Sequence, residues 1–289
     1  MRRDARDYQI LFLSLFLVLG IWARDWTLRS EMIGVAIVTC LLTQLIGSLA
    51  AQYWLWMIGR GQPTPSCDLP FNWRSPLITA LALSLLLRTD HYTTMMVASG
   101  LAIASKFVLQ TNDKHFFNPA NFGIVATLLL TQDAWVSPGQ WGEDVWYVFI
   151  FVGAGGLVLK RVGRWDTTVA FLGSYAFLEA LRNLWLGWTW DVWAHRLMSG
   201  SLLLFALFMI TDPRSIPNAR LGRLVWAGAI ALLTFILRNQ FFIATAVFWA
   251  LFALAPVTIL LDQYWSATRF CWKEPPQLEL PKPSEVMSG

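Results

Sequence analysis

The strongest constraint on the fold is a succession of long apolar segments separated by short polar stretches. Of the 289 residues, 56% are hydrophobic and 14% are charged, whereas soluble domains carry about 25% charged residues. Segments of this kind are typical of helices that cross a lipid bilayer. The sequence therefore predicts an all-α integral membrane protein with about ten transmembrane helices, near residues 9–23, 32–57, 75–87, 93–109, 120–132, 145–160, 166–181, 197–210, 222–237 and 241–261.

The Lys and Arg residues predict the orientation of this polytopic domain, residues 1–272. With a cytoplasmic N-terminus, six basic residues lie outside and sixteen lie inside: Arg2, Arg3, Arg6, Arg60, Arg74, Lys106, Lys114, Lys160, Arg161, Arg164, Arg214, Arg220, Arg223, Arg269, Lys273 and Lys282. This bias is the positive-inside pattern, so both termini are predicted to be cytoplasmic. The Pro-rich polar tail, residues 273–289, is predicted to be disordered.

The remaining surface signals favour lipid over nucleic acid. No basic stripe is interleaved with aromatic residues, which argues against nucleic-acid binding. Tryptophans adjoin many segment ends, as expected for residues that lie among lipid headgroups. These are Trp22, Trp26, Trp135, Trp146, Trp165, Trp188 and Trp265.

Three apolar segments are conspicuously short: 75–87, 120–132 and 197–210. Thirteen residues of helix cover roughly 20 Å, less than the roughly 30 Å hydrocarbon core. Two of these segments also align at an offset of 122 residues, matching Leu81/Leu203, Leu85/Leu207, Thr89/Thr211 and Asp90/Asp212. The alignment predicts two inverted five-helix repeats, about 9–132 and 145–263. Short segments at equivalent places in such repeats point to a site near the middle of the membrane.

Polar residues interrupt the apolar pattern between 106 and 121. Asn118 and Pro119 are typical of a capped helix start, which is the simpler interpretation. Alternatively, the polar run and the positive helix end face a polar or anionic group in a cavity. The Thr211-Asp212-Pro213 step is open to the same two interpretations, a rigid turn or a cavity wall.

A central binding site would draw on charged and hydrogen-bonding side chains from these motifs. Lys106 and Asp212 would carry the charge, and the other members would replace water as donors and acceptors. The predicted set is Thr79, Lys106, Asn118, Asn121, Ser201, Thr211 and Asp212.

Other chemistry finds little support in the sequence. The three histidines each stand alone, with no ligand spacing for a metal, and no nucleotide-binding or hydrolase motif is present. Glu179 is expected to pair with Arg182, three residues later on a helix. Gly153-Ala154-Gly155-Gly156 is expected to pack against another helix, and Cys40 is expected to be a small core residue.

Two motifs resemble the RnfD/NqrB family. One is Phe117-Asn118-Pro119-Ala120 followed by an apolar helix. The other is Ser199-Gly200-Ser201 running into Thr211-Asp212-Pro213. Lys106, Gly222-Arg223, Leu254-Ala255-Pro256 and Asp262 extend the similarity over most of the chain. Members of this family are membrane subunits of bacterial ion-pumping redox complexes, namely the Rnf complex and the sodium-translocating NADH:quinone reductase. The resemblance implies two inverted five-helix repeats, similar to urea and ammonium transporters, in the bacterial inner membrane.

The resemblance also implies flavin chemistry, but with one departure. Family members carry FMN esterified to a Thr of an S-G-A-T-type motif in the outer loop after the fifth helix. The corresponding loop here, residues 133–144, contains no Thr. Covalent FMN is therefore not expected, and a flavin such as FMN or riboflavin would be held non-covalently. The chain would then be an electron-carrying or non-catalytic subunit rather than a self-sufficient enzyme.

Three functions follow from these observations. The first is a membrane subunit of an electron-transport complex that contacts other redox subunits. The second is a stand-alone transporter or channel for a small polar solute or a flavin-like molecule. The third is an accessory scaffold that holds other subunits in the membrane. Flavin absorption after purification, solute flux into liposomes and the neighbouring genes distinguish these functions.

Overall fold

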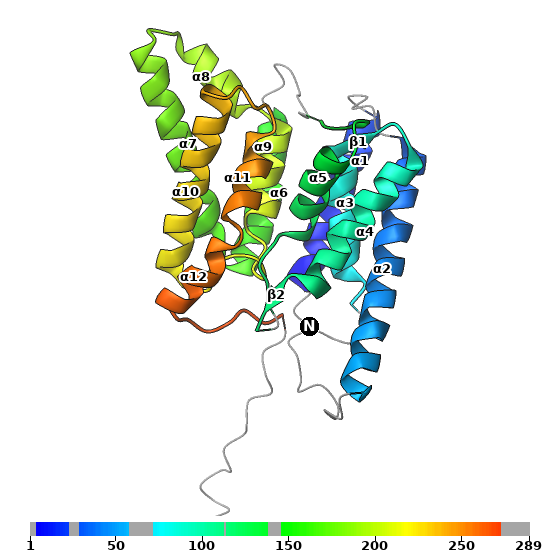
Figure 1. Cartoon of the computed structure of the whole chain (residues 1–289). Coiled ribbons are helices and arrows are strands. Elements are labelled where there is room, and N and C mark those ends of the chain that lie inside the picture. Colours follow the sequence, from blue (N-terminus) through cyan, green and yellow to red (C-terminus); the bar gives the residue numbers. More distant parts are fainter. Residues whose placement is uncertain (1–3, 23–28, 58–71, 113, 138–145, 273–289) are drawn as a thin grey trace, which may run out of the picture.

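The computed structural model describes residues 4–22, 29–57, 72–112, 114–137 and 146–272 (Figure 1). The predicted disordered tail, residues 273–289, lies outside this part of the chain. Helices dominate the described residues. In the first part of the chain they are α1 (Ala5–Trp22), α2 (Ser30–Met57), α3 (Arg74–Leu86), α4 (Tyr92–Val108) and α5 (Pro119–Leu130).

The second part of the chain contains more, and shorter, helical pieces. They are α6 (Trp146–Val162), α7 (Trp165–Trp185), α8 (Trp190–Leu197), α9 (Gly200–Leu204), the π-helix η1 (Phe205–Met209), α10 (Arg220–Asn239), α11 (Ala246–Leu254) and α12 (Val257–Tyr264). Each apolar segment expected from the sequence contains a helix or a broken helix pair. Residues expected to form one short helix at 197–210 instead form α9 and η1, which continue from α8 after a bend of 55°.

The helices support a multi-pass membrane protein. Within the described ranges, α1, α2 and α10 are long and apolar enough to cross a bilayer unaided. Two broken pairs, α8 with α9 and η1, and α11 with α12, also qualify if each pair counts as one span. The expected short segments are short in the structure too, since α3 has 13 residues and α5 has 12. Such short helices need neighbours to cover their ends.

The helices form two groups that lie side by side (Figure 1). In one group, α3 packs against α1 and α2, and α4 packs against α2 and α5. In the other group, α10 packs against α7 and α11. Contacts of α5 with α11 and of α1 with α6 join the two groups. Residues 114–121, at the entrance to α5, therefore lie next to the junction between the groups.

Loops that alternate along the sequence gather at two opposite ends of the molecule. At one end, Arg74 Nε donates to Asp7 Oδ1 at 2.6 Å, and the guanidinium of Arg161 lies 4.2 Å from the ring centre of Tyr8. We call this the Lys114 end. At the other end, the backbone N–H of Asp90 donates to the carbonyl of Asp133 at 3.2 Å; we call it the Asp133 end. These contacts confirm the expected grouping of the loops concerned.

Two short β ladders accompany the helices, which the all-α prediction did not include. Strand β1 (Leu87–Thr89) pairs with β4 (Ala134–Val136), and β2 (Gln110–Thr111) pairs with β3 (Lys114–His115). The first ladder follows the short helices α3 and α5, and the second connects α4 to α5. Their backbone groups lie at the edge of an apolar environment, where an unpaired N–H or C=O costs free energy. The ladders satisfy these groups.

Small residues allow the helices to approach closely. A Cβ atom added to Gly123 of α5 would lie 2.6 Å from the carbonyl oxygen of Ala98 in α4. A Cβ atom on Gly155 of α6 would lie 2.8 Å from Leu207 in η1, which confirms the expected packing role for this glycine. Gly153 and Gly156 have no atom within 4 Å of the Cβ position. Cys40 is fully buried in the core, as expected.

Candidate functional site

The entrance to α5 is a capped helix start that also reaches across the junction. Asn118 is the N-cap, and its Oδ1 accepts a hydrogen bond from the backbone N–H of Asn121 at 3.0 Å. Pro119 occupies the first turn, where its missing N–H costs nothing. The Nδ2 of Asn118 then donates to the carbonyl of Met209, in η1, at 3.1 Å. Capping and contact with the second group are thus combined in one side chain.

Asn121 continues this polar bridge into the core. It is fully buried, and its Nδ2 donates to the carbonyl of Phe248, in α11, at 3.2 Å. Its Oδ1 has no hydrogen-bond partner among the described residues. Buried polar atoms are normally paired, so an unpaired carbonyl oxygen at a helix junction is a candidate contact for water or a polar ligand.

The chain leaves η1 in a turn that faces His115. A π-helical turn widens the helix and is frequent at functional sites. Here it precedes Thr211, which is buried and donates to the carbonyl of Leu207 at 2.9 Å. The next residue, Asp212, places Oδ2 3.6 Å from Nε2 of His115. His115 stands alone in the sequence, and it meets residue 212 only after folding.

The surroundings of His115 and Asp212 lower the pKa values of both side chains. Burial lowers the pKa of His115; Asp212 opposes this effect, and the charges of Lys106 and Arg214 reinforce it. Burial raises the pKa of Asp212, but hydrogen bonds from His115 and from the backbone of Arg214 outweigh it, so the pKa lies below its usual value. The pair therefore presents an ionised carboxylate beside a neutral imidazole at neutral pH.

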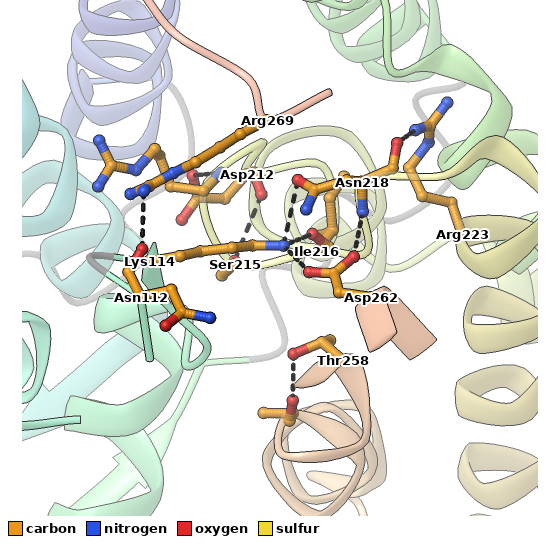
Figure 2. Close-up of polar contacts among 12 residues, drawn as sticks. Asn112, Lys114, Asp212, Ser215, Ile216, Asn218, Arg223, Thr258, Asp262 and Arg269 are labelled. Atoms are coloured by element: carbon orange, nitrogen blue, oxygen red, sulfur yellow. Dashed lines mark hydrogen bonds and ion pairs between the residues drawn. The ribbon is translucent and has the colours of Figure 1, made fainter. Parts of the chain in front are cut away.

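Lys114 contacts three residues of the second helix group and the loop before it (Figure 2). Its Nζ donates to Asp262 Oδ2 at 2.5 Å, to the carbonyl of Ile216 at 2.6 Å and to Asn218 Oδ1 at 3.3 Å. The Lys114 side chain is 10% exposed and that of Asp262 is 20% exposed. Burial lowers the pKa of Lys114, and the carboxylate of Asp262 opposes this effect. The ammonium thus has three oxygen acceptors in place of water.

Asn218 connects this ion pair to a second one. Its backbone N–H donates to Asp262 Oδ1 at 2.7 Å, and its carbonyl accepts from Arg223 Nη1 at 2.7 Å. Arg223 Nη2 in turn binds Asp166 Oδ2 at 2.6 Å, with both side chains 6% exposed. The result is a chain of buried charges across the Lys114 end of the molecule.

The other predicted site residues form hydrogen bonds with other partners. Lys106 Nζ donates to Gln44 Oε1 at 2.8 Å and to Ser75 Oγ at 3.1 Å, and Thr79 binds the carbonyl of Ser75. Ser201 contacts Ser199 at the start of α9. A helix of ten residues separates it from Thr211, roughly 15 Å by helical rise. The structure therefore joins Asn118 to Asn121 and to Met209, two residues before Thr211, and it places Asp212 beside His115. Ser201 lies elsewhere.

One predicted pair is wrong, and several site residues were missed. Glu179 binds Arg196 Nη1 at 3.0 Å and Asn239 Nδ2 at 2.8 Å. Arg182 instead lies over the ring of Trp188. The partners of Lys114 come from distant parts of the chain, so no local sequence motif predicts them. The sequence signals were a charged residue inside or next to an apolar segment, as at Asp166 and Asp262, and the family resemblance at Arg223 and Asp262.

Comparison with known proteins places this geometry in context. A model of the NQR2, RnfD, RnfE family matches residues 72–271. The chain belongs to this family. The match includes α3 through α12, and with them the Asn118 cap, the Asp212 turn and the Lys114–Asp262 pair.

Curated relatives of this family member are named as the D subunit of an ion-translocating oxidoreductase complex. The protein of Actinobacillus pleuropneumoniae serotype 5b (strain L20) is 30% identical over 128 residues, 44% of this chain and 37% of the relative. The protein of Stutzerimonas stutzeri is 32% identical over 127 residues, 44% and 36% of the two chains. That of Vibrio atlanticus (strain LGP32) is 36% identical over 113 residues, which are 38% of this chain and 32% of the relative. The matched part thus spans about a third of the length of each of these relatives.

Proposed function

We propose that this chain is the membrane subunit of a bacterial ion-translocating electron-transport complex of the Rnf type, in the inner membrane. The observation that carries the proposal is family membership over residues 72–271, together with relatives named for such a complex. The buried charges at the Lys114 end support it, because ionisable residues inside membrane proteins commonly mark ion or redox pathways. Other membrane redox subunits are the partners.

We also propose that the ten apolar segments form two inverted five-helix repeats. A pair of related contacts supports this arrangement. Lys106, in the last turn of α4, binds Gln44, and Asn239, in the last turn of α10, binds Glu179. Gln44 and Glu179 are each the fifteenth residue of their helix. The first contact lies near the Lys114 end and the second near the Asp133 end, as inverted repeats require.

The proposed orientation places the Lys114 end in the cytoplasm. The basic residues expected inside include those of the grouped loops at this end, among them Arg74, Lys114 and Arg161. Reporter fusions at the C-terminus test this directly. Fusion to a cytoplasm-active fluorescent protein should fluoresce, and fusion to a periplasm-active phosphatase should be inactive; the opposite result inverts the topology.

The proposed ligand site lies where the groups meet, near Asn118, Asn121, Thr211 and Asp212. The unpaired Oδ1 of Asn121 and the ionised Asp212 would receive donors or a cation. Lys106 and Thr79 would contribute from the first group, and Ser201 from the far end of α9. A flavin, FMN or riboflavin, is the proposed cofactor and would be bound non-covalently.

The decisive experiment is purification of the tagged chain from its native membranes. Co-purification of redox subunits, and ion uptake into vesicles that depends on electron donor and on this chain, is the expected result. Flavin absorption that moves from the protein to the supernatant when the protein is precipitated with acid would support non-covalent binding. A chain that purifies alone and conducts a small polar solute into liposomes without an electron donor would instead establish the transporter function.

A further inference from the structure

The corner between α7 and α8 lies at the Asp133 end of the molecule (Figure 1), and aromatic side chains are exposed there. Trp185 is 89% exposed, Trp188 41% and Trp190 55%. The loop after α10 adds Phe241 and Phe242, which are also exposed. The hydrogen bond between Asn239 and Glu179 holds the end of α10 beside α7. We call these five aromatic residues the aromatic rim.

A guanidinium lies within this rim. Arg182 is half-buried, and its Cζ lies 4.6 Å from the ring centre of Trp188. Arg196 lies on the same ring at 5.6 Å, but it is bonded to Glu179 and Asn239. Within the described part of the chain, no carboxylate lies at ion-pair distance from Arg182. Stacking on an aromatic face leaves the N–H groups at the guanidinium edge able to bind an anion.

The position of the rim identifies the kind of anion. Trp side chains at the end of a membrane helix lie at the level of the lipid headgroups, because the indole has an apolar body and a polar edge. Trp193, on the same corner, uses its Nε1 to bind the carbonyl of Ala176 and so holds α8 against α7. The rim is therefore a fixed surface at the bilayer boundary, with a planar cation among its rings.

We propose that Arg182, stacked on Trp188, binds the phosphate of an anionic phospholipid of the phosphatidylglycerol type. The aromatic rim packs around the glycerol and upper acyl region of that lipid. The guanidinium fork matches two phosphate oxygens, and the net negative charge of the lipid complements a cation that has no protein carboxylate beside it. This site is separate from the junction near Asn118 and does not depend on the ligand proposed there.

Native mass spectrometry of the detergent-solubilised protein, titrated with phosphatidylglycerol or phosphatidylcholine, tests the site. We expect preferential retention of phosphatidylglycerol, and about fivefold weaker binding after Arg182→Gln, as expected for one basic side chain at an anionic bilayer surface. Arg182→Lys should give an intermediate loss. Inorganic phosphate alone should not displace the lipid. The matched control is Arg29→Gln, since Arg29 also lies over an aromatic ring, Tyr92, at the same end.

Three results would overturn the proposal. Equal retention of both lipids by the unaltered protein would remove the preference for an anion. Unchanged affinity in Arg182→Gln would assign the lipid to another surface. Loss of a co-purifying subunit from native membranes, with lipid retention unchanged, would show that the rim contacts protein. If Arg182→Gln does not fold, Arg182→Lys and Trp188→Leu provide the comparison.

Discussion

Lys114, in the hairpin before α5, binds Asp262 of α12, 148 residues later in the chain. This ion pair joins the two helix groups at the Lys114 end, and Asn218 extends it to the pair formed by Arg223 and Asp166. Because these groups are removed from water, each charge depends on its partner. The Lys114–Asp262 ion pair therefore links the first group of helices to α12, in the second group.

Removal of one member of this pair should destabilise the protein more than removal of both. Lys114→Met leaves the half-buried Asp262 without its cation, at a cost of about 2 kcal/mol, less than for a fully buried pair. The double variant Lys114→Met/Asp262→Leu should recover much of this loss. Thermal unfolding in detergent measures the effect, and Lys160→Met, at an exposed position of α6, is the control. Equal destabilisation by the single and double variants would contradict a coupled pair.

Stability should decrease as the pH falls through the titration range of His115. Its pKa in the folded protein lies below the usual 6.5, so below about pH 6.5 the unfolded chain binds this proton more readily than the folded one. The protein is thus destabilised on acidification, and His115→Gln should show a smaller change in unfolding temperature between about pH 7 and about pH 5.5. An identical pH profile for both proteins would show that His115 is not responsible.

Asp212→Asn and Lys106→Met should alter ion or ligand handling more than folding. Asn retains the size of Asp212 and can still accept from the backbone of Arg214, but it removes the charge that faces His115. Donor-driven ion uptake, normalised to the amount of subunit in the membrane, should fall at least about tenfold if a charge in the pathway is lost. Asp191→Asn, at an exposed position of α8, is the control. If both variants fail to reach the membrane, the two residues have structural roles.

Gly123 should tolerate no larger side chain, because α4 and α5 are in close contact there. A Cβ atom would meet the backbone of Ala98 and the side chain of Ala102. Gly123→Val should therefore separate the helices and cost about 2–3 kcal/mol. Gly100, on α4, has open space around its Cα. Gly100→Ala should be neutral or stabilise the helix by up to about 1 kcal/mol, and both effects are measurable as shifts in thermal unfolding.

Local sequence patterns predicted the parts of the site that depend on neighbours along the chain. The helix start at Asn118-Pro119 is one example, since a cap needs only residues three positions apart. The turn at Asp212-Pro213 is another. The grouping of loops at two ends also followed from sequence, because apolar segments force the chain to alternate between ends. These predictions required no knowledge of which helices touch.

Contacts between side chains of different helices could not be predicted from the sequence. Glu179 has a basic residue three positions later, and helical spacing alone favours that partner. The corner between α7 and α8 brings Arg196 back to the carboxylate of Glu179, and the guanidinium of Arg182 lies over the ring of Trp188 instead. His115 and Asp212 likewise look isolated until η1 places the turn beside β3. A single sequence contains no distance between segments, so such contacts cannot be derived from it.

The sequence by itself determined that the chain enters the membrane, where its helices lie and which family it resembles. These properties depend on hydrophobicity and short motifs, which are local. Only the tertiary structure decided which charges are paired and where the first and second helix groups touch. Burial in an apolar environment makes an unpaired charge costly, so the fold must supply Lys114 with Asp262, and helix packing alone selects that partner.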